Sequence, residues 1–126
     1  MPSVPSFDAP DPDSPTPPYE QLRAQVARRV VAGDLPAGAK LPTVRGLAEQ
    51  VGLAVNTVAR VYRELEADGV VETHGRRGTF VATSSVGAGQ DVAADAATYV
   101  GAARRAGLTR DEAVRALDRA WDDAGR

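Results

Sequence analysis

The chain has 126 residues, of which 43% are apolar, 25% are charged and 5% are aromatic, and its formal net charge is -2. This length fits one domain or two small ones. Because the chain contains no cysteine, disulfide frameworks, zinc–cysteine sites and thiol nucleophiles are excluded. No apolar run reaches the ~18 residues that a membrane-spanning helix needs, and the first residues lack the basic start of a signal peptide. We therefore expect a cytoplasmic protein without a membrane partner.

The first residues differ in composition from the remainder. Residues 1–18 hold seven of the nine prolines and carry Asp8, Asp11 and Asp13 without a basic residue. Such a segment has little apolar surface to bury and cannot offset its loss of conformational entropy. We therefore expect residues 1–16 to be a disordered leader.

Three helices are predicted in the middle of the chain, at about residues 19–32, 44–51 and 55–68. In each of them, apolar residues recur at intervals of three and four. Thr43 stands where it can cap the second helix. Only three residues, one of them a glycine, separate the second helix from the third. We therefore expect this pair to be joined by a tight turn.

Residues 70–82 predict a β-hairpin, because two β-prone runs flank the tip His74-Gly75-Arg76-Arg77-Gly78. Residues 83–91 are rich in small residues, as linkers are. Two further helices are expected in residues 91–126, and a Thr-x-x-Glu capping box at Thr109 begins the second of them. The expected fold class is α+β, mainly α with a small β-hairpin.

The order of elements in residues 19–82 indicates a function. Two helices joined by a short glycine-containing turn form a helix-turn-helix, whose second helix can lie in the major groove of DNA. A basic hairpin that follows it forms a wing, whose glycines and arginines suit a narrow groove. The amides at the start of a helix also attract phosphate. This part of the chain is therefore typical of a winged helix-turn-helix that binds double-stranded DNA.

The same residues resemble the winged helix-turn-helix domain of the GntR family of bacterial transcription regulators. The likeness is carried by YEQL from Tyr19, by GDLPAGAKLPTVRGLA from Gly33, by NTV from Asn56 and by RRGTFV from Arg76. It implies a DNA-binding domain over residues 17–84. It also implies a function in transcription regulation, with no enzymatic activity, no catalytic residue and no cofactor.

The resemblance and the helix geometry together assign DNA contacts to ten residues. They lie at the start of the second helix, in the first turns of the third and at the wing tip: Thr43, Arg45, Val55, Asn56, Thr57, Arg60, His74, Gly75, Arg76 and Arg77. Asn56 can pair with adenine, and Val55 can contact a thymine methyl. Ala54 stands where relatives carry a capping Ser, Thr or Asn. We therefore expect fewer polar base contacts and more dependence on the wing and on phosphates.

Residues 91–126 resemble the short two-helix tail of the YtrA-like subfamily, which is a dimerisation device there. The likeness lies in ARRAGLTRDEA, from Ala103. Two amphipathic helices of about 15 residues cannot bury their apolar faces alone, so they must pack on the winged domain or on a second chain. A second copy is favoured, because DNA half-sites about one helical turn apart suit a two-fold protein. We expect a nucleoid-associated homodimeric repressor that binds a pseudo-palindromic operator and responds to an unidentified effector. The resemblance to the YtrA-like subfamily implies that it controls its own operon, transporter genes or both.

Two other functions stay open at this point. The winged helix could be a protein-interaction module without specific DNA binding, although the clustered arginines of the wing argue against it. A small effector could instead bind between the tail and the winged domain, although no convergent polar pocket can be read in residues 83–126. His74 is the single histidine, and without cysteines it is a poor metal ligand, so no metal site is expected.

Overall fold

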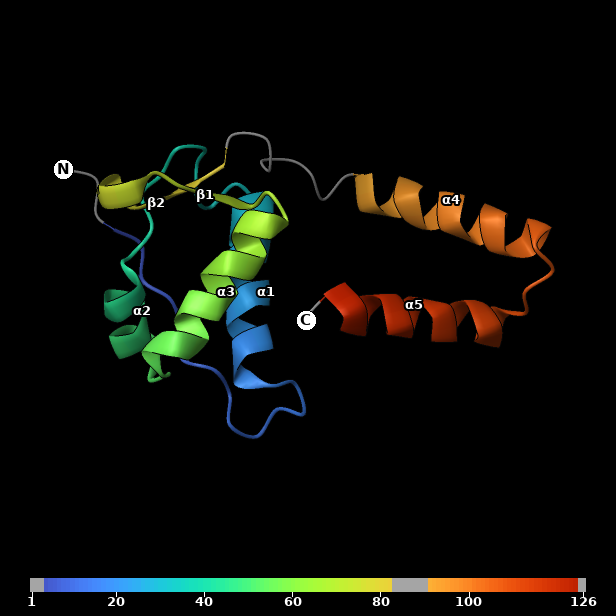
Figure 1. Ribbon diagram of the computed structural model, residues 1–126, viewed down its shortest axis with the longest axis horizontal. Coiled ribbons are helices and arrows are strands. Elements are labelled where there is room, and N and C mark those ends of the chain that lie inside the picture. Colours follow the sequence, from blue (N-terminus) through green and yellow to red (C-terminus); the bar gives the residue numbers. More distant parts are fainter. Residues whose placement is uncertain (1–3, 83–90, 125–126) are drawn as a thin grey trace. The chain divides into compact units, whose positions relative to one another are not determined.

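The computed structural model describes residues 4–82 and 91–124 (Figure 1). The chain divides into two compact units, Met1–Gly89 and Gln90–Arg126. The first unit contains three helices and a β-hairpin: α1 (Pro18–Val31), α2 (Val44–Val51), α3 (Val55–Ala67), β1 (Val71–Thr73), the 3-10 turn η1 (Gly75–Arg77) and β2 (Thr79–Val81). The second contains α4 (Asp91–Arg105) and α5 (Arg110–Ala124). The described elements confirm the expected fold class.

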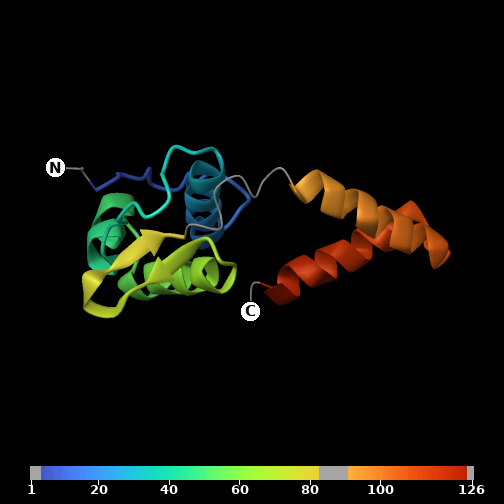
Figure 2. The same cartoon turned by 90° about the horizontal axis from the view of Figure 1, so that it is seen from above.

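Helix α3 is the centre of the first unit, because it packs against α1, α2 and β1. Figure 2 shows the hairpin alongside the three helices. Leucine and valine make up the side chains that are almost fully buried: Leu22, Val26, Val30, Leu41, Leu47, Val58, Val61, Leu65, Val71 and Val81. These residues recur every three or four positions in the helices, as predicted. The core therefore fixes α3 against its neighbours and leaves the opposite face of that helix to solvent.

The hairpin pairs with a third chain segment, which lies between α1 and α2 in the sequence. Gly38 N–H donates to the Val81 carbonyl (2.9 Å), and Leu41 N–H donates to the Thr79 carbonyl (2.8 Å). Lys40 forms an antiparallel bridge with Phe80. Residues 38–41 thus lie along the outer edge of β2. The base of the hairpin is tied to the chain that leads into α2.

Residues 4–16, expected to be disordered, instead pack along α1. The Phe7 side chain is 6% exposed and belongs to the core. The guanidinium of Arg29 lies over the Phe7 ring, 4.6 Å from its centroid, and donates to the Ser6 carbonyl at 2.7 Å. The composition did not indicate this order, because one aromatic anchor was enough to hold a segment that is otherwise poor in apolar residues.

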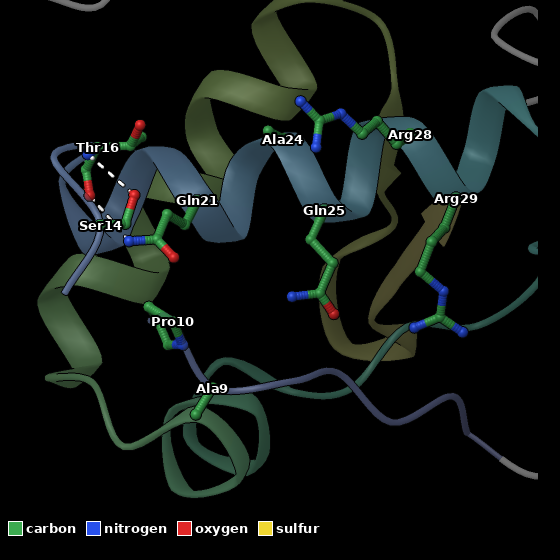
Figure 3. A pocket seen from close by; sticks show the side chains of 9 residues that line it. All are labelled: Ala9, Pro10, Ser14, Thr16, Gln21, Ala24, Gln25, Arg28 and Arg29. Atoms are coloured by element: carbon green, nitrogen blue, oxygen red, sulfur yellow. Dashed lines mark hydrogen bonds between the residues drawn. The ribbon is translucent and has the colours of Figure 1, made fainter. Parts of the chain in front are cut away.

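Glutamine side chains hold the leader by its backbone. The Asp8 and Asp11 amides each donate to the side-chain oxygen of a glutamine of α1, Gln25 and Gln21 respectively, at 2.8 Å. Both glutamines donate back to the carbonyl of the same leader residue at 3.0 Å. Phe7 N–H donates to the Gln50 side chain on α2 (3.0 Å). Figure 3 shows Gln21 and Gln25 at a cavity of about 460 Å³ between the leader and α1.

The second unit is a helical hairpin. Its turn places Gly107 at φ +80°, a conformation that glycine adopts readily. The Thr109 amide donates to Glu112 Oε1 (3.0 Å), and the Glu112 amide donates to the Thr109 hydroxyl (3.2 Å). This pair confirms the capping box. The Tyr99 hydroxyl donates to the Ala113 carbonyl (2.6 Å) and joins the two helices.

Apolar side chains of the helical hairpin remain accessible within the chain. Ala103 is buried, whereas six larger side chains are at least 36% exposed: Val92, Tyr99, Val100, Val114, Leu117 and Trp121. Val114, Leu117 and Trp121 follow one another at intervals of three and four, so they lie along one side of α5. Contacts within the helical hairpin leave all six of these side chains accessible. Within the described part of the chain, every helix is too short or too polar to cross a membrane.

Candidate nucleic-acid interface

The start of α2 places two of the ten assigned residues on the surface. Thr43 caps the helix, since its hydroxyl oxygen accepts a hydrogen bond from Gly46 N–H (3.0 Å). The hydroxyl hydrogen remains able to donate to another group. Arg45 is exposed and has no ion-pair partner among residues 4–82 and 91–124. A hydroxyl donor, an unpaired cation and the positive end of a helix therefore lie within three positions, a combination suited to phosphate.

The start of α3 has no side-chain cap. Ala54 occupies the cap position and makes no side-chain hydrogen bond to the helix, as predicted. The first amides of a helix have no intrahelical acceptor, so those of α3 stay available to an external anion. Val55 is 46% exposed, Asn56 is exposed and Thr57 is half-buried. Two of the three assigned side chains in the first turn of α3, those of Val55 and Asn56, are thus exposed.

Arg60 lies in a different environment from the other assigned residues. Its guanidinium stacks on the ring of Tyr19 in α1, 4.2 Å from the ring centroid. Its Nε donates to Glu64 at 3.2 Å. The side chain is still 43% exposed. The Arg60 guanidinium is therefore in contact with side chains of both α3 and α1. In this respect Arg60 differs from Arg45.

The wing tip is a short 3-10 turn that carries the four remaining assigned residues. His74, Gly75, Arg76 and Arg77 are all exposed. Gly75 has φ +57° and Gly78 has φ +113°, so glycine permits the turn at both of its ends. His74 Nε2 lies 3.2 Å from Glu72 Oε2. Arg76 and Arg77, which form no ion pair with any residue of 4–82 or 91–124, therefore lie exposed at the end of the hairpin.

A buried tyrosine joins the two helices of the helix-turn-helix. The Tyr62 hydroxyl, on α3, donates to the Pro42 carbonyl at 2.6 Å, and Pro42 directly precedes the cap residue Thr43. Burial raises the pKa of the Tyr62 hydroxyl, which therefore stays a protonated donor at neutral pH. The hydrogen bond fixes the start of α2 relative to α3.

One residue near this surface was passed over in the sequence analysis. Lys40, the single lysine, is exposed and lies beside the wing, opposite Phe80. Its position depends on a strand pairing between distant parts of the chain, so no local signal marks it. By contrast, the described residues contain no group of three or more His, Asp or Glu that could hold a metal ion.

Helices α2 and α3, the short turn at Gly52 between them and the hairpin that follows define a winged helix-turn-helix protein. The chain belongs to the gntR family of bacterial regulatory proteins, whose family model matches residues 18–81. Members of this family are transcriptional regulators with DNA-binding domains, not enzymes.

Two relatives illustrate the membership. The chain is 52% identical over 105 residues to the HTH-type transcriptional regulator Rv1152 of Mycobacterium tuberculosis, covering 83% of this chain and 86% of that protein. It is 41% identical over 75 residues to the HTH-type transcriptional repressor YtrA of Bacillus subtilis, covering 60% of this chain and 58% of that protein. The similarity to the second relative thus extends over little more than half of it.

Solved structures share the fold. A transcriptional antiterminator from Listeria monocytogenes is 27% identical, with a TM-score of 0.60 over 98% of this chain and 96% of that one. The DNA-binding domain of AraR, solved in complex with operator ORX1, is 25% identical, with a TM-score of 0.55 over 61% of this chain and 96% of that one. The winged helix-turn-helix of this chain is therefore similar to one that was solved on DNA.

Proposed function

We propose that this protein is a homodimeric repressor that binds a pseudo-palindromic operator in double-stranded DNA. The main support is that α2, α3 and the wing each have exposed side chains to which DNA contacts were assigned. The buried faces of the same elements form one core. A rigid unit with three such groups can engage neighbouring grooves and phosphates at once. The operator complex of the similar AraR domain supports the assignment.

Each group has its own task in this proposal. The first turn of α3 enters the major groove, where Asn56 and Val55 meet base edges and Thr57 meets a base or a phosphate. Thr43 and Arg45 hold a phosphate at the start of α2. His74, Gly75, Arg76 and Arg77 enter the minor groove, whose negative potential attracts arginine.

Arg60 takes a supporting task within the same proposal. Its guanidinium lies on Tyr19, and its Nε already donates to Glu64. A phosphate contact from this side chain is compatible with the stacking, since the side chain is 43% exposed. Base reading is assigned to the first turn of α3, where no such internal contacts are made by Asn56.

The dimer rests on the apolar surface of the helical hairpin. Val100, Leu117 and Trp121 are 51%, 52% and 63% exposed, on helices whose own contacts bury Ala103 but not these side chains. Exposed apolar residues concentrated on two adjoining helices favour an interface. A second copy is the natural occupant, because a two-fold operator calls for a two-fold protein.

Repression follows from position on the DNA. A dimer bound at a promoter excludes the transcription machinery, and the relative YtrA is named a repressor. We infer that the protein described here controls its own operon, transporter genes or both. We also infer that it acts at the nucleoid in the cytoplasm. A signal that changes the spacing of the two winged domains would release it.

The proposal is tested by fluorescence-anisotropy titration of the full chain against its own upstream DNA and a scrambled duplex, over a range of salt concentrations. We expect tighter binding to the upstream DNA and a log affinity that falls steeply with log salt concentration. Equal binding to both duplexes would overturn specific recognition. Absence of binding to either would favour the protein-interaction module instead.

A further inference from the structure

Lys40 lies on the wing although it is distant from it in sequence. Residues 38–41 pair with the outer edge of β2, and the Lys40–Phe80 bridge places these two residues directly opposite each other. Phe80 is also paired with Glu72 of β1. Opposed residues in antiparallel pairs point to the same face. Lys40 is therefore part of the surface of a sheet that ends in the wing tip.

The side chain of Lys40 extends towards that tip. Gly78 lies two residues before Phe80, between β2 and the turn η1 that holds Arg76 and Arg77. A Cβ at Gly78 would be 3.2 Å from Lys40 Cε and 3.9 Å from Nζ. The lysine stem therefore lies over the bare backbone of Gly78, with its ammonium group beside the base of the tip.

No acidic side chain in the described ranges neutralises this ammonium group. Lys40 is exposed, and no carboxylate of residues 4–82 or 91–124 forms an ion pair with it. The carboxylate in the same row of the sheet, Glu72, lies 3.2 Å from His74 Nε2. In a chain with net charge -2, Lys40, Arg76 and Arg77, none of which has an ion-pair partner in the described part of the chain, together create a local positive potential.

We propose that Lys40 is a further DNA-binding residue, whose ammonium group contacts a backbone phosphate beside the groove that the wing enters. This inference rests on the proposed function, because it supplies an additional contact for the same complex. A phosphate is the target because an ammonium group on a flexible stem binds as a point charge and carries little information about base sequence. In this proposal residues 38–41 and the wing tip contact the same DNA duplex.

A charge-neutralising substitution tests the contact. Lys40→Gln should lower the slope of log affinity against log salt concentration by about 0.9, which is roughly an eightfold loss of affinity at ~0.1 M salt. The loss should be equal for upstream and scrambled DNA, and Lys40→Arg should restore most of it. Arg28→Gln is the matched control, because it removes one exposed positive charge from α1, which carries no assigned contact.

A chemical footprint tests the contact without a substitution. Lys40 is the single lysine, so N-hydroxysuccinimide acetate modifies only it and the terminal amine, and mass spectrometry separates the two. We expect DNA to slow acetylation of Lys40 at least several-fold in the unmodified full chain. Because this readout needs no variant, it decides the matter even if Lys40→Gln fails to fold.

The outcomes separate the two proposals. Salt-steep binding by the unmodified chain, with a Lys40→Gln slope like that of Arg28→Gln and no protection of Lys40, would overturn the Lys40 contact alone. A loss confined to the upstream DNA would overturn the assignment to phosphate. Failure of the unmodified chain to bind any duplex would overturn both the Lys40 contact and the proposed function.

Discussion

The hydroxyl of Tyr62 donates a hydrogen bond to the carbonyl of Pro42, 2.6 Å away, within the core of the winged domain. The two residues are 20 positions apart in the chain. Tyr62 lies on the buried face of α3, and Pro42 directly precedes the cap of α2. This bond therefore connects two surfaces that the proposed function places on the same DNA.

Tyr62→Phe should lower the free energy of unfolding by about 1–3 kcal/mol, because it leaves the Pro42 carbonyl buried without a donor. DNA affinity should fall as well, since the start of α2 loses a restraint. Urea unfolding and anisotropy titration measure the two effects. The matched control is Tyr19→Phe, which also removes a tyrosine hydroxyl group but keeps the ring that Arg60 stacks on. Equal stability of the two variants would refute the structural role of the bond.

Arg45→Ala should weaken binding to all DNA sequences and lower the salt slope by about one unit, as expected for one lost phosphate contact. The melting temperature should not change, because the side chain is exposed and has no ion-pair partner among the residues described. Arg28→Ala serves as the control for net charge. An unchanged slope would mean that Arg45 does not touch phosphate.

Phe7→Ala should destabilise the winged domain by about 3 kcal/mol, because the ring is 6% exposed and its removal leaves a cavity. Val4→Ala is the control within the same leader, since Val4 is 48% exposed and should change stability little. Thermal unfolding of both variants provides the comparison. If they unfold at the same temperature, the leader does not contribute to the core.

Leu117→Gln should convert the proposed dimer to a monomer, because it places an amide in the apolar surface of α5. Leu117 is 52% exposed in one chain, so the helical hairpin itself should keep its fold. Sedimentation gives the mass, and emission from the single tryptophan, Trp121, should shift to the red as the interface is lost. Arg115→Gln is the control on the same helix. A dimeric Leu117→Gln protein would contradict the assigned interface.

The capping box predicts a pH dependence for the helical hairpin. Hydrogen bonding with Thr109 lowers the pKa of Glu112; the bond with the Thr109 backbone has the larger effect and the one with its side chain the smaller. A carboxylate whose pKa is lower in the folded state stabilises that state above its unfolded pKa, which is about 4.3. The stabilisation is lost as pH falls through the lower, folded value. Glu112→Gln should therefore be less stable than the unchanged chain at neutral pH.

The comparison is followed by circular dichroism across this range. The difference in melting temperature between the two proteins should shrink as pH falls below about 4. Because Gln retains an acceptor for the Thr109 amide, the variant isolates the charge from the hydrogen bond. A difference that stays constant with pH would show that the charge on Glu112 contributes nothing.

Local signals were sufficient to predict the helices and their ends. Thr43 and Thr109 cap the helices that follow them, and Gly52 ends α2 with φ +70°. Each of these features depends on residues within one turn of the position concerned. The exposed placement of Arg45 and Asn56 follows in the same way, because the apolar residues of α2 and α3 define the buried face.

Features that depend on distant pairing were not predicted. The leader is ordered by glutamines of α1 and α2, and the periodicity of a helix does not reveal that its polar residues hold another segment. Arg60 lies on the same side of α3 as Asn56, but Tyr19 of another helix engages its guanidinium. Lys40 reaches the wing through a bridge that joins positions 40 residues apart.

The start of α3 lacks a side-chain cap in the unbound protein, because Ala54 has no side-chain acceptor. Replacing a capping residue by alanine costs a helix about 1 kcal/mol, and Ala54 leaves that cost in place when nothing is bound. A phosphate oxygen that accepts the amides of the first turn would supply the missing acceptor. Part of the affinity for DNA would then come from stabilising the first turn of α3, which is already helical from Val55 in the unbound chain.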